Sequence, residues 1–196
     1  LLLSALVAFL GLNTEAKADK DTIIIAQGAD AKILDPHRTN DQPSSRVAGQ
    51  IYDSLVKQDS NMKIVPGLAE SWTQVDDRTT EFKLRKDVKF HNGKPLTAKD
   101  VKFTLDRMKA SPEVAHIIRA VSEIEVVDEN TVRIKTEKPF GPLLSHLSHT
   151  AASILNQEAV EELGDKYGQN PVGTGPYQFV NWRAGDRITL KANPDY

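Results

Sequence analysis

The 196-residue chain contains no cysteine and has almost no excess of charge. Without cysteine it can form no disulfide, no thiolate metal site and no cysteine nucleophile. With 25 Lys and Arg residues against 27 Asp and Glu residues, the formal net charge is −2. A protein that binds nucleic acid through its phosphates needs a basic excess, so we expect no nucleic-acid partner. The hydrophobic content of 39% and the charged content of 27% are typical of a soluble globular protein.

Motifs that mark common catalytic and nucleotide-binding sites are also missing. The sequence has no G-x-S-x-G, no H-E-x-x-H and no Walker loop, because Gly93-Lys94 is followed by Pro95 rather than by Ser or Thr. Gly173-Thr174-Gly175 matches half of a dinucleotide fingerprint, but Pro176 would interrupt the start of the phosphate-binding helix. We therefore expect no enzymatic activity and no cofactor.

One pair of histidines offers a metal hypothesis. His146 and His149 have the i, i+3 spacing at which two side chains on a helix can chelate a metal ion. No third ligand is evident nearby in the sequence, so we predict no metal site and expect both histidines to be structural or exposed. A secreted metal-dependent hydrolase built on this pair is the alternative.

The most apolar stretch of the chain is short. Residues Leu1–Leu12 read LLLSALVAFLGL, whereas a helix that crosses a bilayer needs about 20 apolar residues. Ala16-Lys17-Ala18 follows, with small residues at the spacing of a signal-peptide cleavage site. We predict that residues 1–18 belong to a cleavable signal peptide whose first part lies upstream. The mature protein would then be exported and begin at Asp19.

The stretch Phe82–Met108 has the clearest local pattern. Alternation of apolar and polar residues over 82–90 predicts a strand with one buried face and a bulge. His91-Asn92-Gly93 predicts a turn, because Asn and Gly accept a positive φ at little cost. Thr97 and Asp100 have the spacing of a capping box. The helix behind them has an apolar stripe made of Val101, Leu105 and Met108.

The rest of the chain predicts short strands and helices in a mixed order. Before that stretch we expect a buried strand over Thr22–Ala26, a polar loop over 39–43, a helix capped by Ser44 or Ser45, and a hairpin over 73–84. After it we expect hairpins over 124–136 and 177–191, helices over 139–147 and 157–163, and a stiff Gly/Pro loop over 170–176.

Five stretches of the sequence together carry a resemblance to a known family. They are LDPH (34–37), PGLAESW (66–72), FKLRKDVKFHNGKPLTAKDVKFTLDR (82–107), PVGTGPYQF (171–179) and ITLKANPDY (188–196). In combination they resemble the family 5 extracellular solute-binding proteins, which serve ABC transporters for oligopeptides, dipeptides, glutathione, nickel chelates and opines. The resemblance covers essentially all of residues 21–196, although family members usually continue past the position of Tyr196.

The resemblance implies an α/β (mixed α+β) fold, namely the first lobe of a two-lobed periplasmic binding protein with an inserted subdomain. On this basis residues 19–56 open the ligand-binding lobe, residues 57–170 form the inserted subdomain and residues 171–196 return to the lobe. The second lobe and the hinge would be absent from the chain.

The resemblance also implies a function and a site. The protein would capture peptides in the periplasm, glutathione and other short peptides among them, and deliver them as a monomer to the membrane permease of an ABC importer. A carrier of nickel or another metal chelate, or of opines, is the alternative within the same family. By position, Asn40, Asp41 and Gln42 correspond to the segment that contacts the ligand backbone in peptide-binding relatives, in a strand-addition mode.

The first prediction concerns the N-terminus. Because Ala16 and Ala18 form the A-x-A site, we expect cleavage after Ala18 when the complete precursor is exported. N-terminal sequencing of the exported protein should give Asp19 as the first residue. Recovery of residues 1–18 in the mature chain would show that this segment is not a signal peptide.

Overall fold

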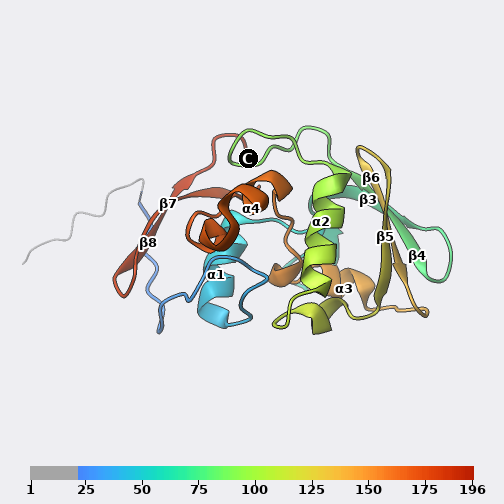
Figure 1. Cartoon of the computed structure of the whole chain (residues 1–196), viewed down its shortest axis with the longest axis horizontal. Helices are drawn as coiled ribbons and strands as arrows, with labels where there is room; N and C mark the ends of the chain where they lie inside the picture. Colours follow the sequence, from blue (N-terminus) through green and yellow to red (C-terminus); the bar gives the residue numbers. More distant parts are fainter. Residues whose placement is uncertain (1–21) are drawn as a thin grey trace, which may run out of the picture.

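The structure is a computed structural model that describes residues 22–196 (Figure 1), so the predicted signal peptide lies outside the described residues. The helices are α1 (Gln42–Ile51), α2 (Ala98–Lys109), α3 (Leu143–Leu147) and α4 (Gln157–Leu163), with 3-10 helices η1 (Ala115–Ile118), η2 (Thr150–Ala152) and η3 (Gly164–Gln169). The strands are β1 (Val56–Gln58), β2 (Ile64–Pro66), β3 (Ala69–Gln74), β4 (Thr79–Leu84), β5 (Val121–Asp128), β6 (Thr131–Thr136), β7 (Tyr177–Arg183) and β8 (Arg187–Ala192). None of the helices within residues 22–196 is both long enough and apolar enough to cross a membrane.

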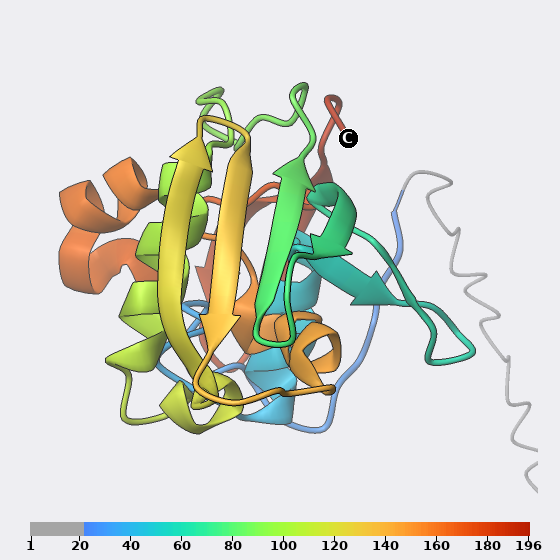
Figure 2. The same ribbon diagram turned by 90° about the vertical axis from the view of Figure 1, so that its right-hand side faces the viewer.

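The largest sheet is antiparallel and has the strand order β3-β4-β6-β5 (Figure 2). β3 and β4 form one hairpin, β5 and β6 form another, and the pairing of β4 with β6 joins them. In the joining pair Phe82 lies opposite Val132, and Thr80 lies opposite Ile134. β7 and β8 pair separately. The hairpins predicted over 73–84, 124–136 and 177–191 are therefore confirmed.

The four-stranded sheet buries one face and exposes the other, because successive side chains on a strand point to opposite faces. Phe82 of β4 and Val132 and Ile134 of β6 are buried. On the opposite face, Arg133 donates from Nε to the Glu81 carboxylate at 2.8 Å. Ion pairs on an exposed face contribute little individually, so the buried face supplies most of the stabilisation of the sheet.

Helix α2 covers the buried face of this sheet, and its start is capped as predicted (Figure 2). One oxygen of the Asp100 carboxylate accepts hydrogen bonds from the Thr97 N–H at 3.0 Å and the Thr97 hydroxyl at 2.8 Å. The other oxygen accepts from the Gln157 N–H at 3.1 Å, which ties α2 to α4. The predicted apolar stripe is fully buried: Val101, Leu105 and Met108.

The hydrophobic interior divides into two clusters. The first cluster joins the four-stranded sheet, α2 and α3, and draws its buried residues from positions 55–154. The second cluster draws its buried residues from positions 31–52 and 155–167, and the β7–β8 hairpin packs partly buried side chains against it. The two ends of the chain segment that forms the first cluster lie side by side, since the Ile154 N–H donates to the Asp53 carbonyl at 2.8 Å. The second cluster is therefore discontinuous in sequence but continuous in space.

The predicted Gly/Pro loop, residues 170–176, closes against the end of α1. The Gly175 N–H donates to the Ile51 carbonyl at 2.8 Å, and His91 contacts the Gly175 carbonyl through Nε2 at 3.0 Å. A Cβ added at Gly173 would lie only 2.1 Å from the Ile51 oxygen, and one at Gly175 would lie 2.6 Å from the Ile51 carbonyl carbon. Both positions therefore need glycine because backbone packs on backbone there.

The prediction of a buried strand over Thr22–Ala26 is wrong. The structure has no strand there, and Ile23, Ile24 and Ile25 are 81%, 91% and 83% exposed. β-branched residues favour extended backbone, but a strand becomes buried only beside partner strands and under a packed layer. Among residues 22–196, no strand pairs with these three isoleucines.

Two element boundaries also differ from the predictions. β4 ends at Leu84 instead of continuing to residue 90, close to where its two neighbours begin, since β6 starts opposite Lys83 and β3 starts opposite Leu84. Helix α3 begins at Leu143 instead of Pro139. Pro142 disfavours helical backbone at the residue before it, which delays the helix.

Candidate functional site

The three residues assigned to ligand contact lie where an irregular loop enters α1. Asn40 and Gln42 are exposed, and Asp41 is half-buried. Within residues 22–196 the backbone N–H and C=O of Asn40 have no hydrogen-bond partner. Exposed peptide groups that are not paired within the protein can bond to an extended ligand.

The Asp41 side chain is committed to the helix. One carboxylate oxygen accepts from the Ser44 N–H at 2.9 Å, and the other accepts from the Ser44 hydroxyl at 3.0 Å and from the Thr39 hydroxyl. Burial raises the pKa of Asp41, but the hydrogen bonds from Thr39 and Ser44 outweigh it, so the net shift is downward. The helix cap predicted at Ser44 or Ser45 is therefore wrong, because the cap is Asp41. Pro43 is tolerated in the first turn of α1, since the N–H groups there have no acceptor within the helix.

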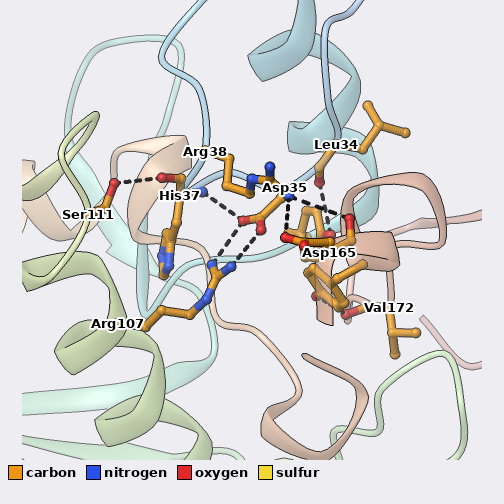
Figure 3. A network of polar contacts seen from close by, with 10 residues as sticks. Leu34, Asp35, His37, Arg38, Arg107, Ser111, Asp165 and Val172 are labelled. Carbon is orange, nitrogen blue, oxygen red and sulfur yellow. Dashed lines mark hydrogen bonds and ion pairs between the residues drawn. The ribbon is translucent and has the colours of Figure 1, made fainter. Parts of the chain in front are cut away.

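The loop that precedes Asn40 is anchored by a buried ion pair (Figure 3). Arg107 of α2 donates from Nη1 and Nη2 to the two oxygens of Asp35, at 2.9 Å and 2.6 Å. The His37 N–H donates to the same carboxylate at 3.0 Å. Burial raises the pKa of Asp35, but the hydrogen bonds and charge of Arg107 lower it more, so the net shift is downward. Asp35 is thus held ionised in the interior.

Three further hydrogen bonds hold the backbone of this loop (Figure 3). The Ser111 hydroxyl donates to the His37 carbonyl at 2.6 Å, and the Tyr52 hydroxyl donates to the Leu34 carbonyl at 3.0 Å. The Leu34 N–H donates to the Gly168 carbonyl at 3.0 Å. The loop is therefore fixed from α1, from the C-terminal end of α2 and from η3.

His37 is buried in this network without a polar partner for its ring. Its side chain lies beside Arg107 (Figure 3), and neither ring nitrogen has a hydrogen-bond partner among the described residues. Burial, and then the charge of Arg107, lower the pKa of His37 to about 4, while the charge of Asp35 opposes this only in part. At neutral pH the ring is therefore uncharged and fills space.

The structure places the two histidines of the metal hypothesis in local contacts. His146 contacts the Ile117 carbonyl through Nδ1 and stacks edge-on against Phe140, with ring centroids 5.0 Å apart. His149 accepts from the Ala151 N–H through Nδ1 at 3.1 Å. Among the residues that the structure describes, no group of three or more metal-binding side chains is arranged to hold an ion. That the pair binds no metal stays a prediction.

Sequence analysis missed the anchors of the candidate segment. Arg107 and Asp35 are 72 residues apart, and Ser111 and His37 are 74 residues apart. No local period or spacing rule connects residues at such separations. The only signal was an acidic residue in an otherwise irregular stretch, the LDPH motif, which did not identify its partner.

The fold is that of a lobe of a periplasmic binding protein. OppA of Haemophilus influenzae, solved in complex with RPPGFSPFR, superposes with a TM-score of 0.80 at 33% identity, over 86% of this chain and 37% of that one. NikZ of Campylobacter jejuni, solved in complex with Ni(L-His), superposes with a TM-score of 0.80 at 30% identity, over 90% of this chain and 36% of that one. The expected fold class is therefore confirmed.

Sequence similarity identifies the family. The family described as bacterial extracellular solute-binding proteins, family 5 Middle, matches residues 63–196, and the chain belongs to this family. The glutathione-binding protein GsiB of Escherichia coli O157:H7 is 37% identical to it over 98% of this chain. The chain spans 39% of the length of that relative.

The buried neutral state of His37 predicts a pH dependence of stability. The unfolded state should bind a proton near the ordinary pKa of 6.5, whereas the folded state binds it only near pH 4. Stability should therefore fall as the pH is lowered from about 6.5 to 4, by on the order of 3 kcal/mol for this residue. We expect the His37→Phe variant to lose this part of the dependence in urea unfolding measured at several pH values.

Burial also lowers the pKa values of His91 and His149, but the parent protein and the His37→Phe variant both contain these residues. The difference in stability between the parent and the variant therefore reports on His37 alone. Asp35 titrates below this window. If the two proteins lose stability equally between pH 6.5 and 4, the ring of His37 is not held neutral by its surroundings.

Proposed function

We propose that this protein is the substrate-binding component of an ABC importer and captures peptides, with glutathione and other short peptides as its ligand class. The observation that carries the proposal is the unpaired backbone of Asn40, an exposed residue whose N–H and C=O have no partner among residues 22–196, in a member of the family 5 solute-binding proteins. The names of GsiB and of the OppA complex support peptides as the ligand class.

In this proposal Asn40, Asp41 and Gln42 contact the ligand mainly through their backbone. Strand addition of this kind gives affinity through main-chain hydrogen bonds and demands little of the side chains. The commitment of the Asp41 carboxylate to Thr39 and Ser44 supports this mode, because that side chain is already used within the protein. The selectivity of the protein would then depend on contacts elsewhere in the complete protein.

The remaining parts of the proposal follow from the family. We propose that the protein is not an enzyme, acts as a monomer in the periplasm and delivers ligand to membrane permease subunits. We also propose that residues 19–56 and 171–196 belong to the ligand-binding lobe and residues 57–170 to an inserted subdomain. The first hydrophobic cluster, at positions 55–154, supports the first boundary, while the packing of positions 155–167 in the second cluster favours an earlier return to the lobe.

Ligand binding by the complete protein and by residues 19–196 alone should differ sharply. Each backbone hydrogen bond contributes only about 0.5–1.5 kcal/mol net in water. Association costs roughly 4–15 kcal/mol, so a few bonds on an open face should bind peptides no better than about 1 mM. The exposed isoleucines at 23–25 should also make residues 19–196 poorly soluble.

Calorimetry with glutathione and a defined library of short peptides checks this expectation on the complete protein and on residues 19–196. Native mass spectrometry of the complete protein should detect a co-purified peptide that is recovered intact. Micromolar binding by residues 19–196 would place the decisive contacts within this chain. Recovery of a nickel chelate or an opine, or cleavage of the peptides, would replace the proposed function.

The same protein tests the metal hypotheses. Replacing both His146 and His149 with Gln should leave the ligand affinity and the metal content unchanged, because Nδ1 of each ring already bonds a backbone group of the protein. Elemental analysis of the purified protein measures the metal directly. Loss of a stoichiometric zinc or nickel ion in the double variant would favour the hydrolase or the chelate carrier.

A further inference from the structure

The residues just before the segment Asn40–Gln42 belong to no helix or strand. α1 fixes its C-terminal side through the cap at Asp41, but three residues, Arg38, Thr39 and Asn40, separate that cap from His37. A short irregular stretch keeps one conformation only if both of its ends are anchored. The Thr39 hydroxyl is tied to the Asp41 cap, and the Arg38 N–H donates to the Asp35 carbonyl at 3.1 Å. The position of the unpaired peptide groups of Asn40 therefore depends on what holds the loop 35–38 as well as on the cap.

Helix α2 supplies that anchor from a different part of the chain. Ser111, just beyond the end of α2, donates to the His37 carbonyl at 2.6 Å, and Arg107 holds Asp35 through two hydrogen bonds. Asp35, His37 and Ser111 are buried, at 1%, 2% and 8% exposed, while the Arg107 side chain is 25% exposed. The planar fork of Arg107 fixes the orientation of the carboxylate as well as its distance.

We propose that Arg107 and Ser111 are positioning residues for ligand binding, which hold the loop 35–38 so that the backbone of Asn40 is preorganised for an extended peptide. The proposal rests on the proposed function, because it assigns the role of these two residues to the same segment. A ligand that binds an already ordered backbone loses no free energy in ordering it, so preorganisation of the loop raises the affinity.

The network also explains why the anchor lies on α2. Arg107 lies on the side of α2 that faces the second cluster, as does Phe103. Leu105 and Met108 lie on the side that faces the first cluster. The same helix therefore touches both hydrophobic clusters. Its register along the sheet is fixed by the buried stripe and by the Thr97–Asp100 cap, so the anchor it offers to the loop is rigid.

The test uses the complete protein with three variants that differ in what they remove. Ser111→Ala deletes the hydroxyl bonded to His37, and Arg107→Lys keeps the charge but loses the two-pronged contact with Asp35. Thr104→Val is the matched control. Thr104 is a fully buried α2 residue whose hydroxyl bonds the backbone of Leu155, accepting from its N–H at 2.9 Å, and makes no hydrogen bond to the loop.

We expect Ser111→Ala and Arg107→Lys to raise the Kd for glutathione or trialanine, whichever the parent protein binds, by about tenfold. Calorimetry should show that the loss is entropic, since the loop must then be ordered on binding. The Arg38 amide, which donates to the Asp35 carbonyl at 3.1 Å, should exchange its hydrogen faster in the free variants. Thr104→Val should lower the stability but keep the Kd and the exchange of the Arg38 amide.

The outcomes separate the two proposals. If the parent protein binds no peptide from a short-peptide library, the proposed function is wrong and the positioning role falls with it. If the parent binds but Ser111→Ala and Arg107→Lys bind equally well, the function stands and the positioning role is wrong. Equal weakening by Thr104→Val would also overturn the role, because the effect would then reflect general destabilisation.

Discussion

The bidentate ion pair between Asp35 and Arg107 is the contact on which the arrangement of this molecule depends most. It joins a loop of the second hydrophobic cluster to a helix that belongs largely to the first. A buried ion pair adds little net stability over apolar packing, but removing one partner costs about 3–5 kcal/mol because the other charge is left uncompensated. The pair therefore acts mainly by specifying one relative placement of the two units.

Neutral groups around the pair complete that specification. The hydroxyls of Ser111 and Tyr52 donate to backbone carbonyls that would otherwise be buried without a partner. Glycine at 173 and 175 lets the returning chain pack directly on the Ile51 carbonyl from the other side. The loop before α1 is thus held by residues from α2 and from the end of α1, and the returning chain packs on the end of the same helix.

The sequence predicted the parts of this structure that depend on neighbours along the chain. The Thr97–Asp100 cap, the stripe of α2, the three hairpins and the closure of α4 at Gly164 all follow from spacing and turn chemistry. The prediction of a buried strand at Thr22–Ala26 is wrong, because the burial of a strand depends on partner strands that the local sequence pattern does not reveal. Position in the family suggested Asn40–Gln42, but the anchors Arg107 and Ser111 are long-range contacts without a local signature.

The meeting of Asp53 with Ile154 has a consequence for how the molecule folds. The buried residues of the first cluster all lie within positions 55–154, so most of its contacts can form while the second cluster is still open. Joining positions 31–52 to positions 155–167 through an unfolded loop would carry a large closure entropy. Once the first cluster has folded, its two ends lie side by side, and no further loop-closure entropy opposes the joining of the second cluster. The folded first cluster then acts as a template that brings positions 31–52 and 155–167 together.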